Sequence, residues 1–327
     1  MHAHFTEGAD LSDPEVLASL LGEDAEEAQA LGANGVPATA NTVFPAPIPP
    51  RCSRMRCGRH TPTSLGRVRI TSLGFRTDVA LRVLEGGEVT DRGDYLVVRT
   101  PANPDFWWGN FLLLTSVPGP GQAGAWLARF AAEFPAAGHV ALGVDTTDNP
   151  ALPADLAAAG LEAERATVLT AAQPSPPARL NTETEIRPLD SDADWRQSVD
   201  LALRCSDGDD PTGFLLRRAT ARQRLTQTGA GAWFGAFAGG RLRAQLGLFD
   251  VGDGYARYQH VETDPQARRR GLAGTLVWTA GRYGREVLGS STFVIVADPA
   301  DTAIRVYQAC GFTPQQRQLS LERPPPE

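Results

Sequence analysis

A glycine turn near residue 270 constrains the fold of this chain more than any other segment. The extended segment 255–262 leads into Arg268-Arg269-Arg270-Gly271-Leu272-Ala273, after which apolar residues recur at helical spacing. A turn that passes from a strand into a helix leaves unpaired backbone N–H groups at the positive end of the helix dipole. The sequence therefore predicts a strand–turn–helix unit whose turn binds phosphate.

The length and composition are those of an ordinary soluble protein. The 327 residues predict about two domains. Hydrophobic residues make up 42% and charged residues 21%, and the longest strongly apolar run, residues 111–115, is far too short to cross a bilayer. Because the N-terminus lacks the basic-then-apolar order of a signal peptide, we expect a cytoplasmic protein.

The net charge and the cysteine pattern indicate which binding partners and which redox state to expect. The formal net charge of −7 argues against broad nucleic-acid affinity, which depends on basic surface. All 31 basic residues are arginine, which we interpret as the usage of a GC-rich bacterial genome. Cys52, Cys57, Cys205 and Cys310 are scattered, so we expect reduced thiols. We expect a small-molecule or peptide partner, no nucleic acid, no membrane, and a monomer or homodimer.

Two motifs carry a resemblance to a known family. The spacing Arg-x-x-Gly-x-Ala at 268–273 resembles the Arg/Gln-x-x-Gly-x-Gly/Ala motif of the GNAT superfamily of acyl-CoA-dependent N-acyltransferases, which binds the coenzyme pyrophosphate. Just before it, Val261–Pro265 is similar to the strand-to-loop segment of that family, with Pro265 ending the strand. Further on, residues 301–312 are similar to the second family motif, a helix that carries a tyrosine and closes on Gly-Phe.

The chain divides into segments of different composition. Residues 1–64 are rich in Ala, Gly, Pro and acidic residues, with one short helical pattern at 14–31, and are predicted to be a disordered leader. A Pro-rich linker at 173–183 separates segment 65–172 from segment 184–323, and 324–327 is a tail. The resemblance implies that 184–323 is a catalytic GNAT domain.

The second segment has the element order of the resembled fold, a central mixed, mainly antiparallel sheet flanked by helices (α/β, α+β mixed). Gly239-Gly240 predicts a hairpin turn. The predicted elements are strand 185–189, helices 194–205 and 214–228, strands 232–238, 242–249 and 255–262, helix 271–288, strand 292–296, helix 302–310, and the alternating segment 318–322.

The first segment repeats part of that plan. It predicts helix 125–134, strand 139–144, short helix 153–159 and strand 167–171. Aligning 139–145 with 292–298 places Ala159-Gly160-Leu161 opposite Cys310-Gly311-Phe312. The phosphate turn has no counterpart, because Trp107–Phe111 and then Val117–Gly121 stand where it belongs. We therefore predict tandem GNAT-like domains whose first copy, 65–172, is degenerate and non-catalytic.

The coenzyme residues follow from the turn and from the resemblance. Gly271 can adopt backbone angles closed to other residues and lets phosphate approach closely. The alternative is a solvated basic start of a helix. The resemblance adds Val261 and Thr263, whose backbone groups hold the pantetheine arm in family members. The predicted acetyl-CoA-binding residues are Val261, Thr263, Arg268, Arg269, Arg270, Gly271, Leu272, Ala273 and Gly274.

Three residues are candidates for the proton transfers of the reaction. The resemblance implies that Tyr307 is the general acid that protonates the leaving thiolate; the alternative is an aromatic ring packed beside Phe312. For the general base, Glu262 and His260 are candidates, because strand alternation places both on one face, and the third possibility is that neither acts. One departure from the family is Ala300, which stands where an asparagine is common.

Three further patterns have mainly structural interpretations. The loop Ser206–Asp210 could attract a cationic amine, but a helix cap before Pro211 is the favoured reading. Arg217, Arg218, Arg222 and Arg224 on the next helix predict an exposed face, with contact to a coenzyme phosphate as the lesser alternative. The spacing of Cys52, Cys57 and His60, with His2 or His4, does not favour zinc, so no metal is expected.

The resemblance implies an N-acyltransferase that moves acetyl from acetyl-CoA to a primary amine by direct attack. No covalent enzyme intermediate is needed, and Cys310 is predicted to lie in the core. The alternative is a catalytically inactive acyl-CoA sensor or assembly protein with the same fold.

Overall fold

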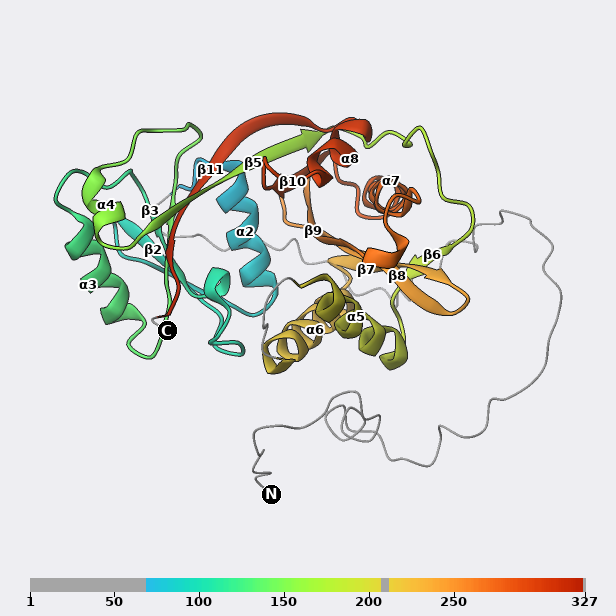
Figure 1. The fold of residues 1–327 in the computed structure, drawn as a ribbon, viewed down its shortest axis with the longest axis horizontal. Coiled ribbons are helices and arrows are strands. Elements are labelled where there is room, and N and C mark those ends of the chain that lie inside the picture. The colour runs from blue at the N-terminus through green and yellow to red at the C-terminus, as the bar shows by residue number, and fades with distance from the viewer. Residues whose placement is uncertain (1–68, 207–211, 326–327) are drawn as a thin grey trace, which may run out of the picture. The chain divides into compact units, whose positions relative to one another are not determined.

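The computed structural model describes residues 69–206 and 212–325. They belong to the compact unit Pro62–Glu327, and the other unit is Met1–Thr61. The predicted disordered leader, the Cys52/Cys57/His60 cluster and the acidic part of the 206–210 loop lie outside the described residues. The described chain forms one 11-stranded mixed sheet flanked by helices, with the strand order β1-β2-β3-β4-β11-β5-β10-β9-β8-β7-β6 (Figure 1).

The second half confirms the predicted order of strands and helices. Its elements are β6 (Glu185–Pro188), α5 (Asp192–Cys205), α6 (Thr212–Gln227), β7 (Gly231–Ala238), β8 (Arg241–Asp250), β9 (Tyr255–Thr263), α7 (Leu272–Glu286), β10 (Thr292–Ala297), α8 (Ala303–Ala309) and β11 (Thr313–Arg323). The hairpin predicted at Gly239-Gly240 joins β7 to β8, and both glycines have positive φ.

Local sequence explains where the helices of this half begin and which face they bury. Ser191 and Asp194 form a capping box that starts α5. In α7, Leu272, Leu276, Val277 and Ala280 recur at helical spacing and are buried against the sheet. α5 and α6 cover one face of β6–β9 and α7 covers the other (Figure 1). The end of β9 is therefore accessible to groups from both layers.

The first half contains the four elements that its sequence predicted and several that it did not. Its elements are α2 (Leu73–Leu84), β1 (Glu88–Asp91), β2 (Tyr95–Arg99), the 3₁₀ turn η1 (Trp107–Gly109), β3 (Phe111–Leu114), α3 (Ala123–Glu133), β4 (Val140–Val144), α4 (Ala154–Ala158) and β5 (Glu162–Ala171). β3, α3, β4, α4 and β5 follow one another as β9, α7, β10, α8 and β11 do in the second half. This order repeats, in the first half, the later part of the GNAT-like plan.

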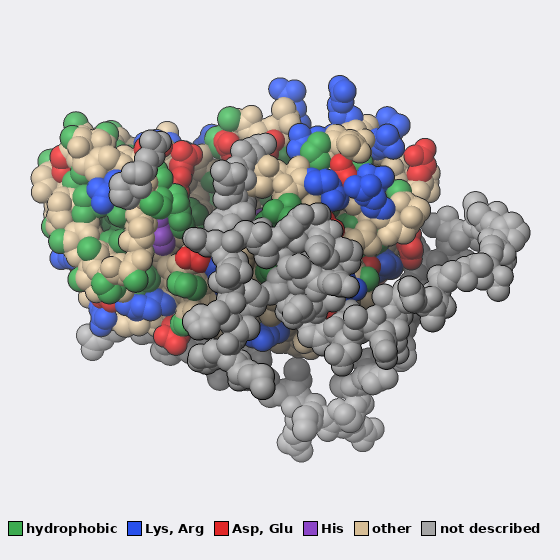
Figure 2. Space-filling view, turned by 60° about the horizontal axis from the view of Figure 1, so that its bottom comes forward, with side chains coloured by type: hydrophobic (Ala, Val, Ile, Leu, Met, Phe, Trp, Pro, Cys, Tyr) green, Lys and Arg blue, Asp and Glu red, His purple; other side chains and the backbone are tan. Residues whose placement is uncertain are grey.

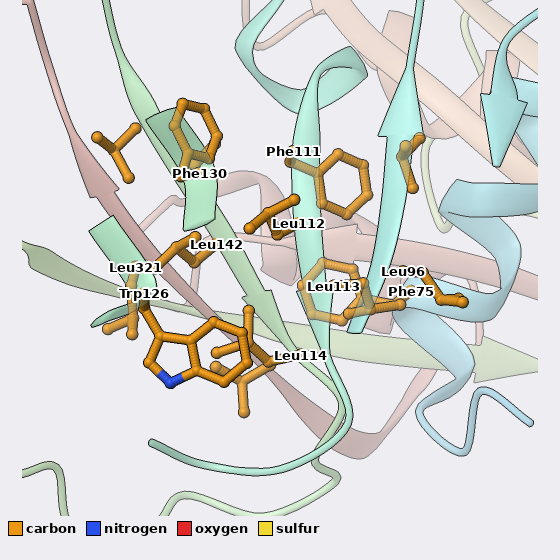
Figure 3. Close-up of a cluster of buried hydrophobic side chains, with 14 of the residues drawn as sticks. Phe75, Leu96, Phe111, Leu112, Leu113, Leu114, Trp126, Phe130, Leu142 and Leu321 are labelled. Carbon is orange, nitrogen blue, oxygen red and sulfur yellow. The ribbon is translucent and has the colours of Figure 1, made fainter. Parts of the chain in front are cut away.

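The two halves exchange their last strands. β5, which ends the first half, pairs antiparallel with β10 of the second half, whereas β11, which ends the second half, pairs with β4 of the first. β5 and β11 also pair with each other along most of their length. Leu321 of β11 consequently lies in the first-half core beside Leu142, Trp126 and Leu112 (Figure 3). The part of the sheet that belongs to each half is therefore continued by the last strand of the other half.

Candidate active site

Strands β9 and β10 part where the resembled family holds its coenzyme. Their parallel pairing covers only three residue pairs and ends at Arg257 and Val294. β9 continues to Thr263 along β8, and β10 turns to β5 up to Ala297. Within the described residues, the edge of β9 that carries Val261 and Thr263 therefore has no strand partner on the β10 side, and its backbone groups are available to an extended ligand.

A bulge in β9 accompanies this parting. His260 has φ 43°, and the register against β8 shifts between the pairs Gly247–Gln259 and Gln245–Glu262. One extra residue is thus inserted, which bends the strand and interrupts its alternation. The assumption of simple alternation was wrong at this point, although the side chains of His260 and Glu262 still approach one another.

The turn before α7 has the geometry that its sequence predicts. Gly271 is the N-cap of α7 and has φ 79°, a left-handed conformation that favours glycine. Within the described residues, the backbone N–H groups of Gly271, Leu272, Ala273 and Gly274 form no hydrogen bond. Arg268, Arg269 and Arg270 are exposed beside them. Free amides, a helix dipole and three exposed cations together suit a pyrophosphate.

The Pro-rich linker lies along α7 and ends beside this turn. A Cβ atom on Gly271 would lie 2.8 Å from the carbonyl oxygen of Arg179, and one on Gly274 would lie 3.1 Å from Pro177. Asn181 donates from its side chain to the carbonyl of Arg270 at 2.9 Å. Gly271 is therefore required by the packing of the linker as well as by the backbone angle, a constraint that the motif alone does not reveal.

A cavity of about 260 Å³ lies beside the turn, where the linker ends. It includes Arg270, Leu272, Asn181 and Arg243 in its lining. The cavity borders the predicted pyrophosphate turn but does not include Gly271 or Ala273.

Glu262 sits in a hydrogen-bond network on the α5–α6 side of the sheet. Its Oε2 accepts a bond of 2.6 Å from Gln245 Nε2. Gln245 is fully buried and accepts from Ser198 Oγ at 2.5 Å and from Trp233 Nε1 at 3.0 Å. These bonds fix the orientation of the carboxylate, whose side chain remains 20% exposed. Glu262 is therefore both oriented and accessible.

The hydrogen bond between Arg218 and His260 defines the tautomer of the imidazole. Arg218 Nη2 lies 2.6 Å from His260 Nε2. Because a guanidinium only donates, Nε2 accepts and the ring proton of the neutral imidazole lies on Nδ1, 4.0 Å from Glu262 Oε1. Partial burial and the nearby cations Arg218 and Arg222 lower the pKa of His260. The imidazole is neutral and has no free lone pair with which to take a proton.

Tyr307 lies on α8 in the second-half core. Its side chain is 6% exposed and packs in the same cluster as Phe312, Leu272 and Leu276. Its hydroxyl makes no hydrogen bond within the described residues. Burial, with smaller contributions from Asp301 and Cys310, raises the pKa of Tyr307 well above its usual value. The phenol is thus protonated at neutral pH, as a general acid must be.

Neither described thiol is a good nucleophile. Cys310 is fully buried, as predicted, and burial raises its pKa to about 11. Cys205 is half-buried near the carbonyl of Thr263, and burial together with the charge of Glu262 raises its pKa to about 11. Both thiols are protonated at neutral pH, and the thiolate is the nucleophilic form.

The arginines of α6 depart from the prediction of an exposed face. Arg224 is exposed, but Arg222 is 6% exposed and its guanidinium lies 4.3 Å from the centre of the Trp233 ring. Arg217 turns to Asp105 and Asn103 of the first half. The prediction was wrong for Arg222 because a helix that packs on a sheet buries one stripe, and Arg222 belongs to that stripe.

A second cavity was not signalled by any motif. It measures about 880 Å³ and lies on the first half, with Phe214 of α6 at its rim. Trp107 and His139 stack in its wall, with ring centres 5.3 Å apart and an angle of 7° between the rings. Figure 2 shows hydrophobic side chains gathered on the left-hand part of this face, with a histidine among them. Single aromatic residues scattered over a sequence do not predict such a cavity.

Two negative findings apply to the part of the chain that the structure describes. Over residues 69–206 and 212–325, no group of three or more His, Cys, Asp or Glu side chains is arranged to hold a metal ion. In the same ranges, no helix has the length and apolar character needed to cross a membrane.

Comparison with known proteins agrees with this geometry. Residues 195–312 match the acetyltransferase (GNAT) family. The second half of the chain is therefore a GNAT-family domain. No curated protein sequence matches the chain.

Solved structures extend the likeness to both halves. A conserved protein of unknown function from Staphylococcus epidermidis aligns with 73% of this chain and 95% of its own, at 11% identity and a TM-score of 0.57. A GCN5-related N-acetyltransferase from Kribbella flavida aligns with 77% of this chain and 97% of its own, at 16% identity and a TM-score of 0.53. A tandem GNAT protein from the clavulanic acid biosynthesis pathway aligns with 80% and 91%, at 14% identity and a TM-score of 0.48. At these identities the likeness concerns the fold.

Proposed function

We propose that this protein transfers the acetyl group of acetyl-CoA to a primary amine by direct attack. The observation that carries the proposal is the parting of β9 from β10 beside the free N–H groups at the start of α7. A parted strand pair offers a slot for an extended acyl-pantetheine arm, and the helix start offers an anion site for its pyrophosphate. The degenerate copy predicted in the first half has neither motif in its sequence.

Different residues of this site would bind different parts of the coenzyme. The pyrophosphate would bind to the amides of Gly271, Leu272, Ala273 and Gly274, with Arg268, Arg269 and Arg270 as neighbouring cations. The pantetheine arm would bind along β9 at Val261 and Thr263. Acetyl-CoA supplies the activated acyl group, and the chain supplies its orientation and the proton transfers.

The proton transfers are assigned to Glu262 and Tyr307. Glu262 takes the proton of the amine, directly or through a water, because its carboxylate is oriented by Gln245 and reaches solvent. His260 is not the base, since Arg218 occupies its Nε2 atom and its Nδ1 atom carries the proton, 4.0 Å from Glu262 Oε1. Tyr307 gives its proton to the departing thiolate, consistent with the raised pKa of its phenol.

A thermal-shift measurement followed by a thiol-release assay tests this proposal. Acetyl-CoA at about 100 times its dissociation constant adds about 2.7 kcal/mol of stability, which raises the Tm by about 5 °C or more. A broad panel of amines is then assayed for release of free CoA, with propionyl-CoA as a second donor. No Tm shift would contradict coenzyme binding, and a shift without release from any amine would point to the inactive sensor.

A further inference from the structure

Arg218 and Arg222 of α6 lie near Glu262, but among the described residues neither forms a hydrogen bond or an ion pair with a carboxylate. Only 6% of Arg222 is exposed. Within the described residues it forms no hydrogen bond and no ion pair. Arg218 donates only to the neutral imidazole of His260. A buried cation without an anion is costly, so a fold that keeps two of them is unusual.

The positive charges of Arg218 and Arg222 also repel each other. Arg218 and Arg222 lie four residues apart on α6, a spacing that places side chains on one face, where like charges repel. Arg82 of α2 adds a third positive charge, and its guanidinium lies over the ring of Phe106, as that of Arg218 does. Repulsion from Arg222 and Arg82, after burial itself, lowers the pKa of Arg218.

The nearby carboxylates are engaged elsewhere. Glu85 pairs with Arg82 at 2.7 Å, and Asp78 pairs with Arg257 at 2.8 Å. Glu262 accepts from Gln245 and faces His260. Among the described residues, four arginines thus share three carboxylates around a neutral imidazole, which leaves one positive charge in excess.

We infer that the amine acceptor is an amino carboxylate whose carboxylate binds Arg218 and Arg222. This inference rests on the proposed function and specifies its acceptor. A single imidazole ring, that of His260, separates the Arg218 guanidinium from the Glu262 carboxylate. An amine and a carboxylate a few bonds apart can therefore reach Glu262 and the arginines together. Guanidinium groups match carboxylates in a bidentate geometry, which gives specificity as well as affinity.

The same arrangement excludes a simple cationic amine. A polyamine or another acceptor without an anionic group would bring further positive charge to a site that already has an excess. The acceptor is selected by the charge that it carries next to its amine.

Substrate pairs that differ only in charge test the inference through activity. Amino acids and β- and γ-amino acids are compared with their carboxamides as acceptors of acetyl from acetyl-CoA. We expect kcat/KM for the best acid to exceed that for its amide by at least about tenfold, because a bond to a charged group contributes about 1.5–3 kcal/mol. Arg222→Met should remove this preference, whereas the exposed neighbour Arg224→Met should keep it. Equal rates for acids and amides would overturn the inference.

A stability measurement tests it without any catalysis. N-acetyl amino acids carry the carboxylate of the expected product, and their carboxamides are neutral controls at matched ionic strength. We expect the acids alone to raise the Tm of the wild type, and Arg222→Met and Arg218→Gln to lose this rise. If acids and amides shift the Tm equally, the carboxylate site is wrong, whatever the acetyl-CoA assay shows. If acids bind but no amine is acetylated, the proposed function fails and the anion site stands.

Discussion

Tyr307 and His260 are held in neutral forms by their surroundings. Burial raises the pKa of the Tyr307 phenol. Partial burial and the nearby arginine side chains lower the pKa of the His260 imidazole. The phenol therefore keeps its proton through the neutral range, and the imidazole does not gain one. Glu262 is the proposed base because its carboxylate is oriented by Gln245 and reaches solvent.

At the residue scale, Tyr307→Phe separates acid catalysis from packing. Phenylalanine keeps the ring in its buried position and removes only the hydroxyl, which has no partner in the described residues. We expect kcat to fall by about 10²-fold or more while the acetyl-CoA-induced Tm shift stays within a degree of the wild type. Unchanged turnover would return Tyr307 to its alternative interpretation, an aromatic ring packed beside Phe312.

The stability of the protein should depend on pH through His139, which is buried, and His260, which is partly exposed. Burial lowers the pKa of His139 and, with nearby arginines, that of His260, so below about pH 6.5 the unfolded chain binds protons that the folded chain does not. Stability is then fully present above that pH and is lost as the pH falls through it. We expect the Tm to drop between pH 7.5 and 5.5.

His260→Asn is the matched variant for this pH dependence. Asparagine tolerates the positive φ of 43° at this position and does not titrate. The slope of Tm against pH should be shallower in the variant than in the wild type. Identical slopes would mean that His260 titrates in the folded protein as it does in the unfolded chain.

At the scale of elements, the sequence was informative where a local rule determines the geometry. Gly271 predicted a left-handed N-cap, and the apolar spacing after it predicted α7, because both depend on residues close in the chain. The bulge at His260 was not predictable in this way. It depends on the register between β8 and β9, and the sequence alone contains no signal for register.

The burial of Arg222 in the site was likewise not predictable from the sequence. Its position on α6 was correct, but its burial depends on which face of α6 meets the sheet. A helix with several arginines and weak apolar periodicity does not reveal that face. The partner of a charged side chain, unlike the helix that carries it, is a tertiary property.

Ala273 tests the anion site at the start of α7. Ala273→Asp places a carboxylate in the first turn, where the dipole stabilises the free protein by about 0.3–1 kcal/mol but repels a pyrophosphate. We therefore expect an unchanged or higher Tm without ligand and loss of the shift with acetyl-CoA. Ala273→Ser, which adds no charge, is the control and should keep the shift.

Two glycines in helices should respond oppositely to the same substitution. A Cβ atom on Gly281 of α7 would lie 2.5 Å from Pro174 of the linker, whereas one on Gly124 of α3 would meet nothing within 4 Å. Gly281→Ala should therefore destabilise by about 1–3 kcal/mol, and Gly124→Ala should stabilise by up to about 1 kcal/mol. Urea denaturation of both variants measures this, and a stabilising Gly281→Ala would refute the packing of the linker on α7.

At the scale of the whole molecule, the exchange of β5 and β11 lay beyond sequence reasoning. The tandem plan was visible because the two halves share an order of strands and helices. Each last strand could have closed its own sheet, and the choice between the two pairings depends on contacts far apart in the chain. The domain boundaries at 172 and 184 remain a prediction, because the sheet is continuous across both halves.

The exchange predicts that neither half is stable alone. A fragment that begins at residue 173 lacks β5 and leaves β10 with an open edge, and one that ends at residue 183 lacks β11 beside β4. Unpaired edges of this kind promote aggregation. We expect each fragment to be insoluble when expressed singly and the two to copurify as a folded complex when coexpressed. A soluble, cooperatively unfolding fragment 173–327 would contradict this.

The central claim is that one coenzyme site exists per chain and that it lies at the start of α7. Isothermal titration of the full chain with acetyl-CoA measures both parts of this claim at once. We predict one molecule bound per chain in the wild type and in Ala273→Ser, and none in Ala273→Asp. Two molecules per chain, or undiminished binding to Ala273→Asp, would contradict it.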